Sequence, residues 1–413
     1  MSKVLEGAMA SQIVDFFEKS GLFSESQYGL RSNKNTSLGI LSLVDGIIEA
    51  FEEKRYCSAL FCDLSKAFDC VTHSLLLEKL ERYNFCNQSL QFIRSYLRNR
   101  SQIVRMGGVS SAAALVNIGV PQGSILGPIL FLIYINDLPL NTVENVVLFA
   151  DDTTVFVTGD SEQVAQRRLS VARGSVEEWF RSNKLLLNKD KTQHMMFSLR
   201  ETSSNNTDNG IKFLGVTLDC KLKWDMHVEN LCKKLASSVF VIRNLSECVS
   251  GATLRMAYFS LFHSVMSYGI LVWGGSAHTY RVFGLQRKIV RVLAGLSYRE
   301  DCKQAFVNLE ILTFPSLYIM ENLLYVKQNQ GLYQSHSGQH EYDTRGKNNL
   351  LTERCRLRKS QSKPGFFAVK CFNHLPDSFK DLTIKDFKNK IKHLLIKHAF
   401  YSTDDFFKHS FRN

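Results

Sequence analysis

Short apolar runs separated by polar residues recur through the first half of the chain and predict a mixture of strands and helices. Residues 59–62 form an apolar run of strand length that ends at Asp63. Two further runs, residues 146–148 and 155–157, flank the sequence Phe-Ala-Asp-Asp. Two β-branched and aromatic segments joined by a short polar stretch predict a β-hairpin. The apolar residues 125–135 predict a buried helix.

Longer segments with apolar residues at helical spacing predict helices towards both ends of the chain. The predicted helical regions are residues 1–56 (around a polar turn at 27–36), 221–300 as three helices (the first at 224–245), and 385–397 as a basic helix. Residues 256–273 are the one candidate membrane span, but Ser260 and His263 within them are costly in lipid, so a buried helix is expected. Residues 213–216 alternate as in a strand.

Adjacent carboxylates at the predicted hairpin tip are the first candidates for chemistry. Asp151 and Asp152 repel each other unless a cation lies between them, and a hard ion such as Mg²⁺ suits such oxygen ligands best. Asp63 would meet Asp151 if their strands are neighbours, and a two-metal site needs carboxylates from two segments. Each also has a plain structural interpretation. The pair suits a solvated turn, and Asp63 suits the N-cap of a following helix, a role that Asp69 would fill equally well.

The charge of the chain is divided unevenly along its length. Its 413 residues carry a net charge of +12, and 45% of them are hydrophobic, which excludes wholesale disorder. Residues 1–220 carry a net charge of −2, whereas residues 221–300 and 301–413 carry +7 each. The acidic part contains the candidate metal ligands, and the basic part suits a polyanion such as nucleic acid. A soluble protein with a merely basic surface has the same composition.

Ten cysteines are scattered along the chain without a close Cys-x-x-Cys pair. Neither zinc-ligand spacing nor a secretory signal is evident, so reduced thiols in an intracellular protein, cytoplasmic or nuclear, are the simplest expectation.

Five segments in a fixed order carry a family resemblance. They are residues 63–69 (Asp-Leu-Ser-Lys-Ala-Phe-Asp), 119–128 (Gly-Val-Pro-Gln-Gly-Ser-Ile-Leu-Gly-Pro), 149–152 (Phe-Ala-Asp-Asp), 183–192 (with Asn183, Asn188 and Lys191) and 213–215 (Phe-Leu-Gly). In sequence and spacing the chain resembles the reverse transcriptases of non-LTR (LINE-type, jockey-like) retrotransposons, from about residue 2 to about residue 296. The resemblance implies a right-hand polymerase of the α+β class.

The resemblance also implies catalytic roles at matched positions. Asp63, Asp151 and Asp152 would form an acidic triad, in which the first two hold two Mg²⁺ ions, with Mn²⁺ as a possible substitute, and Asp152 supports the site. Lys191 would neutralise or protonate the departing pyrophosphate, although a solvated lysine is an alternative and Lys189 is a close competitor. In this scheme the protein mainly supplies position and charge.

The nucleotide-binding residues implied by the resemblance are Phe68, Gln122, Gly123 and Arg31. Phe68 would be a steric gate that excludes the 2′-hydroxyl of ribonucleotides, although a core aromatic is the plainer interpretation. Gln122 and Gly123 would contact the incoming nucleotide and the template base, or simply form a loop before a helix. Arg31 lies in a segment similar to one in the family's fingers, and a solvated loop is equally consistent with it.

Primer and template contacts are implied for two further segments. Phe213, Leu214 and Gly215 would hold the primer backbone, or form an ordinary strand of the sheet. Arg287, Lys288 and Arg291 lie on a predicted helix that resembles the family's thumb, and they suit a duplex backbone. A solvated basic face is the alternative.

The expected architecture combines these assignments. Partial fingers (residues 1–56), a palm with an antiparallel sheet (57–220), a helical thumb (221–300) and a basic C-terminal extension (301–413) follow one another. The expected partners are an RNA template, a DNA primer and deoxynucleoside triphosphates, with no membrane, and an element-encoded endonuclease possible in trans.

Departures from the family leave two hypotheses open. An early fingers motif is only partly present at residues 2–6, which predicts an N-terminally truncated enzyme. The first hypothesis is an active RNA-directed DNA polymerase. The second is a truncated, catalytically inactive remnant that binds nucleic acid. An RNA-dependent RNA polymerase is disfavoured by Phe68 and by the Ala-Asp-Asp sequence.

Overall fold

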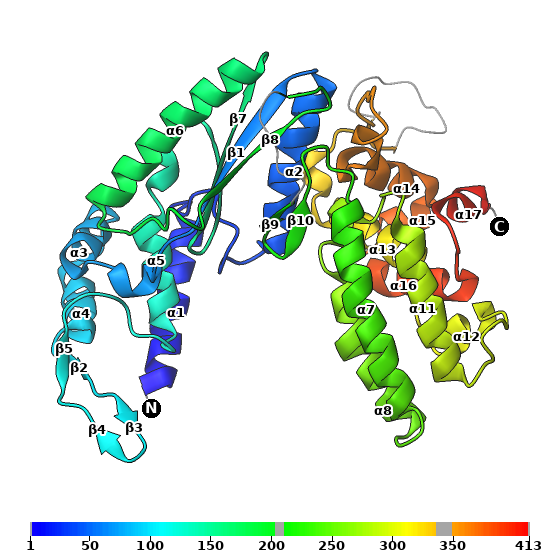
Figure 1. Ribbon diagram of the computed structural model, residues 1–413, viewed down its shortest axis with the longest axis horizontal. Helices are drawn as coiled ribbons and strands as arrows, with labels where there is room; N and C mark the ends of the chain where they lie inside the picture. The colour runs from blue at the N-terminus through cyan, green and yellow to red at the C-terminus, as the bar shows by residue number, and fades with distance from the viewer. Residues whose placement is uncertain (1, 203–209, 336–348, 412–413) are drawn as a thin grey trace. The chain divides into compact units, whose positions relative to one another are not determined.

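In the computed structural model, residues 2–202, 210–335 and 349–411 are described, and they form two compact units. Unit 1 comprises residues 1–43 and 53–207, and unit 2 comprises residues 44–52 and 208–413. Figure 1 shows that both units mix helices with β-structure, and that the larger sheet belongs to unit 1.

The centre of unit 1 is a four-stranded antiparallel sheet in the order β6-β7-β1-β8. Its strands are β1 (Tyr56–Cys62), β6 (Asn145–Phe149), β7 (Asp152–Gly159) and β8 (Gln193–Phe197). The apolar runs predicted as strands supply β1, β6 and β7, and β1 is almost wholly buried because it pairs on both edges. The predicted α+β class with an antiparallel sheet is therefore confirmed.

Helices cover this sheet through apolar faces that the sequence sets at helical spacing. In α6 (Glu162–Ser182) the buried residues include Ala165, Leu169, Ala172 and Val176, at steps of three or four, and the helix packs on β7 and β1. By contrast, α5 (Leu126–Ile135) is apolar all round, and Pro128 is its only residue that is not buried. The helix predicted at residues 125–135 is therefore confirmed, and it forms part of the core of the unit.

The remaining elements of unit 1 are mostly helical. They are α1 (Ser2–Lys19), α2 (Thr36–Glu52, whose last nine residues belong to unit 2), η1 (Ala67–Cys70), α3 (His73–Arg82), α4 (Asn87–Leu97) and η2 (Leu138–Asn141). Two small ladders, β2 (Arg100–Gln102) with β5 (Ala114–Val116) and β3 (Arg105–Met106) with β4 (Val109–Ser110), form a separate ribbon.

The described residues of unit 2 are helical apart from one hairpin and an isolated β-bridge. Its first elements are β9 (Ile211–Phe213), β10 (Val216–Leu218), α7 (Asp225–Leu245), α8 (Gly251–Ala257), the π-helix η3 (Tyr258–His263), α9 (Ser264–Ser267), α10 (Ile270–Trp273) and α11 (Thr279–Ala294). Its later elements are α12 (Lys303–Asn308), α13 (Phe314–Gln328), η4 (Gln330–Leu332), η6 (Ser360–Ser362), the π-helix η7 (Pro364–Ala368), α14 (Val369–His374), α15 (Asp377–Lys380), α16 (Ile384–His398) and α17 (Thr403–Lys408). The helices predicted at 224–245 and 385–397 are confirmed as α7 and α16.

The bounds of the compact units differ from the four predicted domains. Residues 221–300 are not separated from residues 301–413, because the fully buried Gln286 donates to the carbonyl of Leu312 at 2.8 Å and accepts from the amide of Phe314 at 2.7 Å. Residues 44–52 belong to unit 2 because the buried Lys363 pairs with Asp45 and Glu49 on α2. The sequence pattern contains no signal for either link, since both depend on tertiary contacts.

Two further expectations about residues 208–300 are corrected. The region holds more than three helices, and the single helix expected at 256–273 is divided, because the backbone turns at Tyr268-Gly269, where Gly269 has φ of 62°. The strand expected at 213–216 is a hairpin whose turn residues, Leu214 and Gly215, both have positive φ. Within the described residues, no helix is both long enough and apolar enough to cross a membrane.

Candidate active site

The β6–β7 hairpin presents the two adjacent carboxylates. Phe149 pairs with Asp152 across the hairpin, so Ala150 and Asp151 form a two-residue turn, and Ala150 adopts a left-handed conformation with φ of 54°. Asp151 therefore lies in the turn, and Asp152 is the first residue of β7. The hairpin predicted from the flanking apolar runs is confirmed.

The structure brings Asp63 to this hairpin, because β1 and β7 are neighbours in the sheet. Cys62, the last residue of β1, pairs with Thr153, so Asp63 emerges beside the turn. Asp63 caps no helix, since the next helical turn begins only at Ala67 and Lys66 precedes it. The N-cap interpretation of Asp63 is therefore wrong, and the meeting of carboxylates on neighbouring strands is what the structure shows.

The three carboxylates influence one another electrostatically. Residue Asp152 is exposed as a whole, yet protein atoms crowd its carboxyl group. This partial desolvation, followed by the negative charges of Asp151 and Asp63, raises the pKa of Asp152 to about 6. A cation bound between these carboxylates would relieve this repulsion.

A divalent cation fits this donor set, although the side chains do not form a closed ligand cage as they stand. No group of three His, Cys, Asp or Glu side chains with metal-binding geometry occurs in residues 2–202, 210–335 and 349–411. Like-charged carboxylates move apart until an ion draws them together, which accounts for the open arrangement. The ligands are hard oxygens from two chain segments, which is the donor set that Mg²⁺ prefers.

Relief of this repulsion yields a prediction for Asp152→Asn in metal-free buffer. The pKa of Asp152 is raised on folding, so its contribution to stability is present below its ordinary pKa of 3.8 and is lost as the pH rises through about 6. At neutral pH the variant should therefore unfold at a higher temperature than the parent, because its free energy of unfolding is larger by about 1 kcal/mol after allowing for solvent screening. The gain should vanish at about pH 4. Thermal unfolding across this pH range checks it. A variant no more stable than the parent at neutral pH would contradict the repulsion.

The loop that follows α6 carries Lys191 to the same place. The backbone amide of Asn188 donates to the carbonyl of Asp63 at 2.8 Å, and the amide of Ser65 donates to the carbonyl of Leu186 at 2.8 Å. Lys191 Nζ consequently lies 3.8 Å from Asp63 Oδ2, with the Lys191 side chain largely in solvent and the Asp63 side chain partly buried. Among the described ion pairs Lys189 has none, so the geometry favours Lys191 of the two lysines proposed from the sequence.

The Pro-Gln-Gly loop packs against the segment that follows Asp63. The amide of Val120 donates to the carbonyl of Phe68 at 2.9 Å, and Gln122 Nε2 donates to Asp69 Oδ1 at 3.0 Å. Gly119 is required here, because a Cβ atom would lie 2.9 Å from the backbone of Asp69. Gln122 and Gly123 thus stand exposed beside Phe68.

Phe68 combines the two interpretations left open by the sequence. Its ring packs on that of Phe131 of α5, with centroids 4.6 Å apart, and one part of the side chain remains exposed. A ring that is anchored on one side and open on the other has the rigidity that a steric gate requires.

Gln27 is a site residue that the sequence analysis missed. It is 1% exposed, and its Oε1 atom accepts hydrogen bonds from the amides of Ala150 (3.1 Å) and Gly29 (2.8 Å). The amide of Tyr28 and the carbonyl of Leu148 add a backbone bond of 2.8 Å. Residues 26–29, here called the clasp, therefore fix the turn formed by Ala150 and Asp151. A glutamine directly before Tyr-Gly inside a polar segment was the available signal.

Arg31 does not join the carboxylates and is held within its own segment. Its side chain is 7% exposed, forms two hydrogen bonds with the Glu18 carboxylate and donates to the carbonyl of Ser24. The adjacent Glu18 carboxylate raises the pKa of the Arg31 guanidinium above its usual range. This arrangement differs from the nucleotide contact expected from the sequence, because a triphosphate would have to displace Glu18.

The segments expected to hold primer and template lie in unit 2. Tyr268 donates through its hydroxyl to the carbonyl of Leu214 at 2.7 Å and closely covers Gly215, while Phe213 is buried in β9. On α11, Lys288 is exposed, Arg287 lies over the Phe283 ring, and Arg291 donates to the carbonyl of Glu300. Only Lys288 of these three basic residues points to solvent without a recorded interaction among the described residues.

The carboxylates on neighbouring strands and the lysine beside them form the candidate active site. Residues 1–218 match the family described as reverse transcriptase (RNA-dependent DNA polymerase), and the chain belongs to this family. Membership confirms the resemblance drawn from the five motifs and the right-hand polymerase class expected from them.

Individual relatives are named as polymerases of a transposon and of a mobile element. The chain is 28% identical over 344 residues to a protein named as a probable RNA-directed DNA polymerase from transposon X-element of Drosophila melanogaster, covering 77% of this chain and 38% of that protein. It is 28% identical over 318 residues to the RNA-directed DNA polymerase from mobile element jockey of the same organism, covering 71% and 34%. The chain thus spans little more than a third of the length of these relatives.

Among solved structures, apo telomerase from Candida Tropicalis matches with a TM-score of 0.43 and 11% sequence identity, over 75% of this chain and 53% of that one.

Proposed function

We propose that this chain is an RNA-directed DNA polymerase that extends the 3′-hydroxyl of a primer with deoxynucleotides on an RNA template. The observation that carries the proposal is the convergence of Asp63, Asp151, Asp152 and Lys191 at one end of the β1–β7 pair, in a chain of the reverse transcriptase family. Unit 1 alone contains all four residues.

The carboxylates would hold Mg²⁺, or Mn²⁺ in its place. When bound, two such ions activate the primer hydroxyl and stabilise the leaving pyrophosphate. The chain supplies fixed positions for the ligands: Asp63 at the end of a buried strand, and Asp151 in a turn held by the clasp. Asp152 would add negative charge beside the ions, and Lys191, which lies next to Asp63, would supply a positive charge to the leaving pyrophosphate.

Phe68, Gln122 and Gly123 would form the nucleotide-binding surface, since the Pro-Gln-Gly loop and the Phe68 segment are hydrogen-bonded to each other. In unit 2, Phe213, Leu214 and Gly215 would contact the primer, and Arg287, Lys288 and Arg291 would contact the duplex backbone. Because its proposed substrates are RNA and DNA, the protein would act inside the cell, in the cytoplasm or the nucleus.

Primer extension tests the proposal directly. The full chain is given a DNA primer annealed to an RNA template, with Mg²⁺ and the four deoxynucleotides, beside a reaction containing a chelator. Extension that requires the divalent ion supports the polymerase. Binding of the primer–template without extension under any divalent ion would instead support the inactive remnant.

Substitution of Phe68 by alanine should admit ribonucleotides. Removal of the ring opens space at the sugar C2′ position, so discrimination against ribonucleotides should fall by about 10-fold or more. Single-nucleotide extension with matched deoxy- and ribonucleotides measures it. Because Phe68 also packs on Phe131, the thermal stability of the variant is measured in parallel. Unchanged sugar selectivity in a folded variant would leave Phe68 as a core residue only.

Lys191→Ala and Lys189→Ala form a matched pair that decides between the two lysines. Lys191 lies beside Asp63 and Lys189 does not, so we expect the maximal extension rate to fall about 10- to 100-fold in the first variant only. Pre-steady-state extension at saturating nucleotide measures the rate. Equal losses in the two variants, or a loss confined to Lys189→Ala, would refute the assignment.

A further inference from the structure

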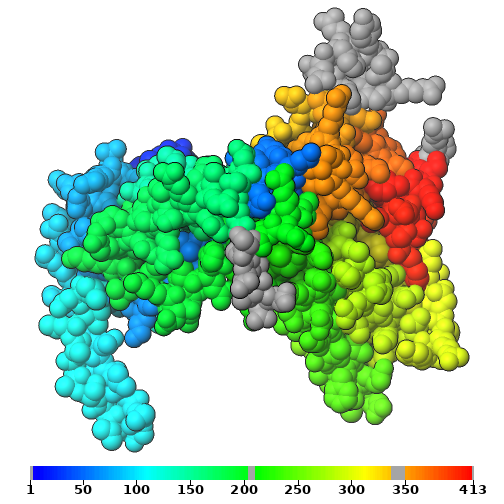
Figure 2. Space-filling model, turned by 45° about the horizontal axis from the view of Figure 1, so that its top comes forward, coloured from blue at the N-terminus to red at the C-terminus, as the bar shows by residue number. Residues whose placement is uncertain are grey.

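Residues 98–118 form a β-ribbon, here called the arm, that stands apart from the sheet of unit 1. Its two ladders, β2 with β5 and β3 with β4, are continued by a hydrogen bond of 2.8 Å from the amide of Ser111 to the carbonyl of Val104. Gly107 and Gly108, both with positive φ, make the turn at the tip. Figures 1 and 2 both show the arm, in cyan, projecting from the rest of the unit.

The arm has no core of its own. Every residue from 98 to 118 except Val116 is exposed, and the exposed side chains include Ile103, Val104, Met106 and Val109, with Met106 82% exposed. A two-stranded ribbon with both faces in water is only marginally stable, so such a surface calls for a partner.

The faces of the arm near its tip differ in chemistry. Met106 pairs with Val109, so their side chains share one face, and Val104 lies two residues along the same strand on that face. Arg105 pairs with Ser110 on the opposite face. Among the described residues, its guanidinium donates a hydrogen bond only to the Ser110 hydroxyl. The tip thus offers aliphatic contacts on one side and a cation on the other.

The sequence segment that contains the arm carries charge of one sign. Residues 82–136 contain five arginines (Arg82, Arg94, Arg98, Arg100 and Arg105) and neither an aspartate nor a glutamate. This run lies within a unit whose sequence is otherwise rich in carboxylates. The absence of acidic residues over this length complements a polyanion.

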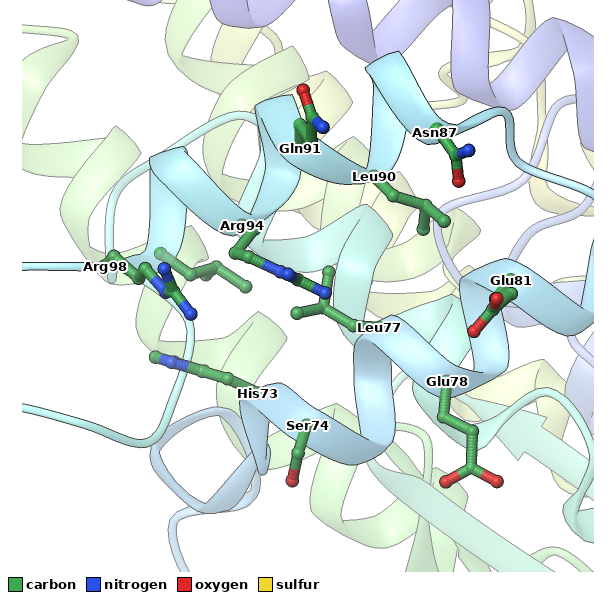
Figure 3. Close-up of a pocket in the computed structure, with 11 residues that line it drawn as sticks. His73, Ser74, Leu77, Glu78, Glu81, Asn87, Leu90, Gln91, Arg94 and Arg98 are labelled. Carbon is green, nitrogen blue, oxygen red and sulfur yellow. The ribbon is translucent and has the colours of Figure 1, made fainter.

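Two of these arginines lie where the arm leaves the unit. A pocket between α3 and α4 is lined at one side by His73, Arg94 and Arg98, with Glu78 and Glu81 at the other, as Figure 3 shows. His73 is fixed by a 2.8 Å hydrogen bond between its ring nitrogen and the carbonyl of Gly119, where the arm returns to the unit. Two arginines therefore flank the point from which the arm leaves.

We propose that the arm binds double-stranded DNA by entering its major groove, with Arg94, Arg98, Arg100 and Arg105 contacting phosphates. The major groove of B-form DNA is about 12 Å wide and admits a two-stranded β-ribbon, and thymine methyl groups there suit aliphatic side chains. An RNA duplex has a major groove too narrow for the ribbon, and its minor groove offers 2′-hydroxyls that Met106 and Val109 cannot bind. The arm has no aromatic side chain for stacking on the bases of a single strand.

Binding of a short blunt DNA duplex with blocked 3′ ends tests this surface without any polymerisation, so the proposal stands or falls apart from the polymerase function. The full chain is titrated without divalent ions, over a range of salt concentrations. Arg100→Gln with Arg105→Gln should raise Kd about 10-fold and reduce the slope of log Kd against log salt by about 2. Met106→Ser with Val109→Ser should raise Kd several-fold and leave the slope unchanged. All four positions are exposed, so these variants leave the core intact.

The matched control is Arg167→Gln with Arg181→Gln, which removes two exposed arginines of α6 in the same unit. Unchanged binding in this control, with weaker binding in both arm variants, supports the proposal. Arm variants that bind DNA as the control does would overturn it. Losses that are equal or larger on an RNA duplex of the same sequence would also overturn it, and so would arm variants that lose only self-association in sedimentation.

Discussion

Replacement of Asp151 by asparagine is expected to abolish primer extension while leaving nucleic-acid binding in place. The substitution keeps the size of the side chain and removes the negative charge that would hold a metal ion. Loss of a ligand that acts in the transition state should lower the maximal extension rate on the order of 10³-fold or more. The turn itself should survive, because its hydrogen bond to Gln27 uses the amide of Ala150.

Asp160→Asn is the matched control for this experiment. Asp160 follows the far end of β7, its side chain is 90% exposed, and it pairs only with the surface residue Arg55 among the recorded ion pairs. We expect this variant to extend primers at the parental rate. Primer–template affinity is measured for both variants by equilibrium titration. Extension at near-parental rates by Asp151→Asn would refute the metal site, whereas equal inactivation of both variants would point to a general defect.

The sequence predicted the parts of the site that depend on local pattern. Apolar runs on both sides of Asp151-Asp152 specify a hairpin, because the period of the side chains and the short polar link act over a few residues. The neighbouring position of Asp63 required more, since strand order is a tertiary property, and it came from the family resemblance. The fully apolar residues of α5 allowed only a buried helix.

The parts that could not be predicted depend on partners distant in sequence. Arg31 and Gln27 lie in the same polar segment, and the sequence does not distinguish their roles. Arg31 forms an ion pair with Glu18, whereas Gln27 accepts a hydrogen bond from Ala150, which is 123 residues away. The turn at Leu214-Gly215 could not be predicted, because Phe-Leu-Gly-Val is equally compatible with a strand. The pairing of Phe213 with Val216 and the positive φ of both turn residues show the hairpin. Residues 221–300 are joined to 301–413 by buried contacts such as those of Gln286 and the ring pair Trp273–Phe314, which no periodicity marks.

The clasp explains how a turn of two residues can be stiff enough for catalysis. A two-residue turn has few internal contacts, but the amide of Ala150 is fixed by Gln27, and the strand before it is fixed by Tyr28. Gly29 lets the clasp approach, since a Cβ atom at this position would lie 2.5 Å from the nitrogen of Ala150. The position of Asp151 therefore depends on a residue that touches no substrate.

Gly29→Ala should for this reason cost much more activity than stability. The added methyl group cannot fit without moving the backbone of residues 149–150 or of the clasp. A displacement of catalytic groups by about 1 Å lowers rates about 100-fold, and we expect a loss of that order in maximal extension rate. The apparent Mg²⁺ affinity should weaken as well, because the carboxylates shift relative to one another. The free energy of unfolding should fall by only about 1–3 kcal/mol.

Gly174→Ala provides the contrast for Gly29→Ala. Gly174 lies inside α6, where an added Cβ would meet nothing within 4 Å, so this variant should gain up to about 1 kcal/mol of stability and keep its activity. Extension rates at varied Mg²⁺, with thermal unfolding of the same samples, compare the two. If Gly29→Ala retained parental rates and Mg²⁺ dependence, the clasp would be a structural contact alone. A selective loss in Gly29→Ala would instead mean that the geometry of the candidate metal ligands is set by residues 26–29.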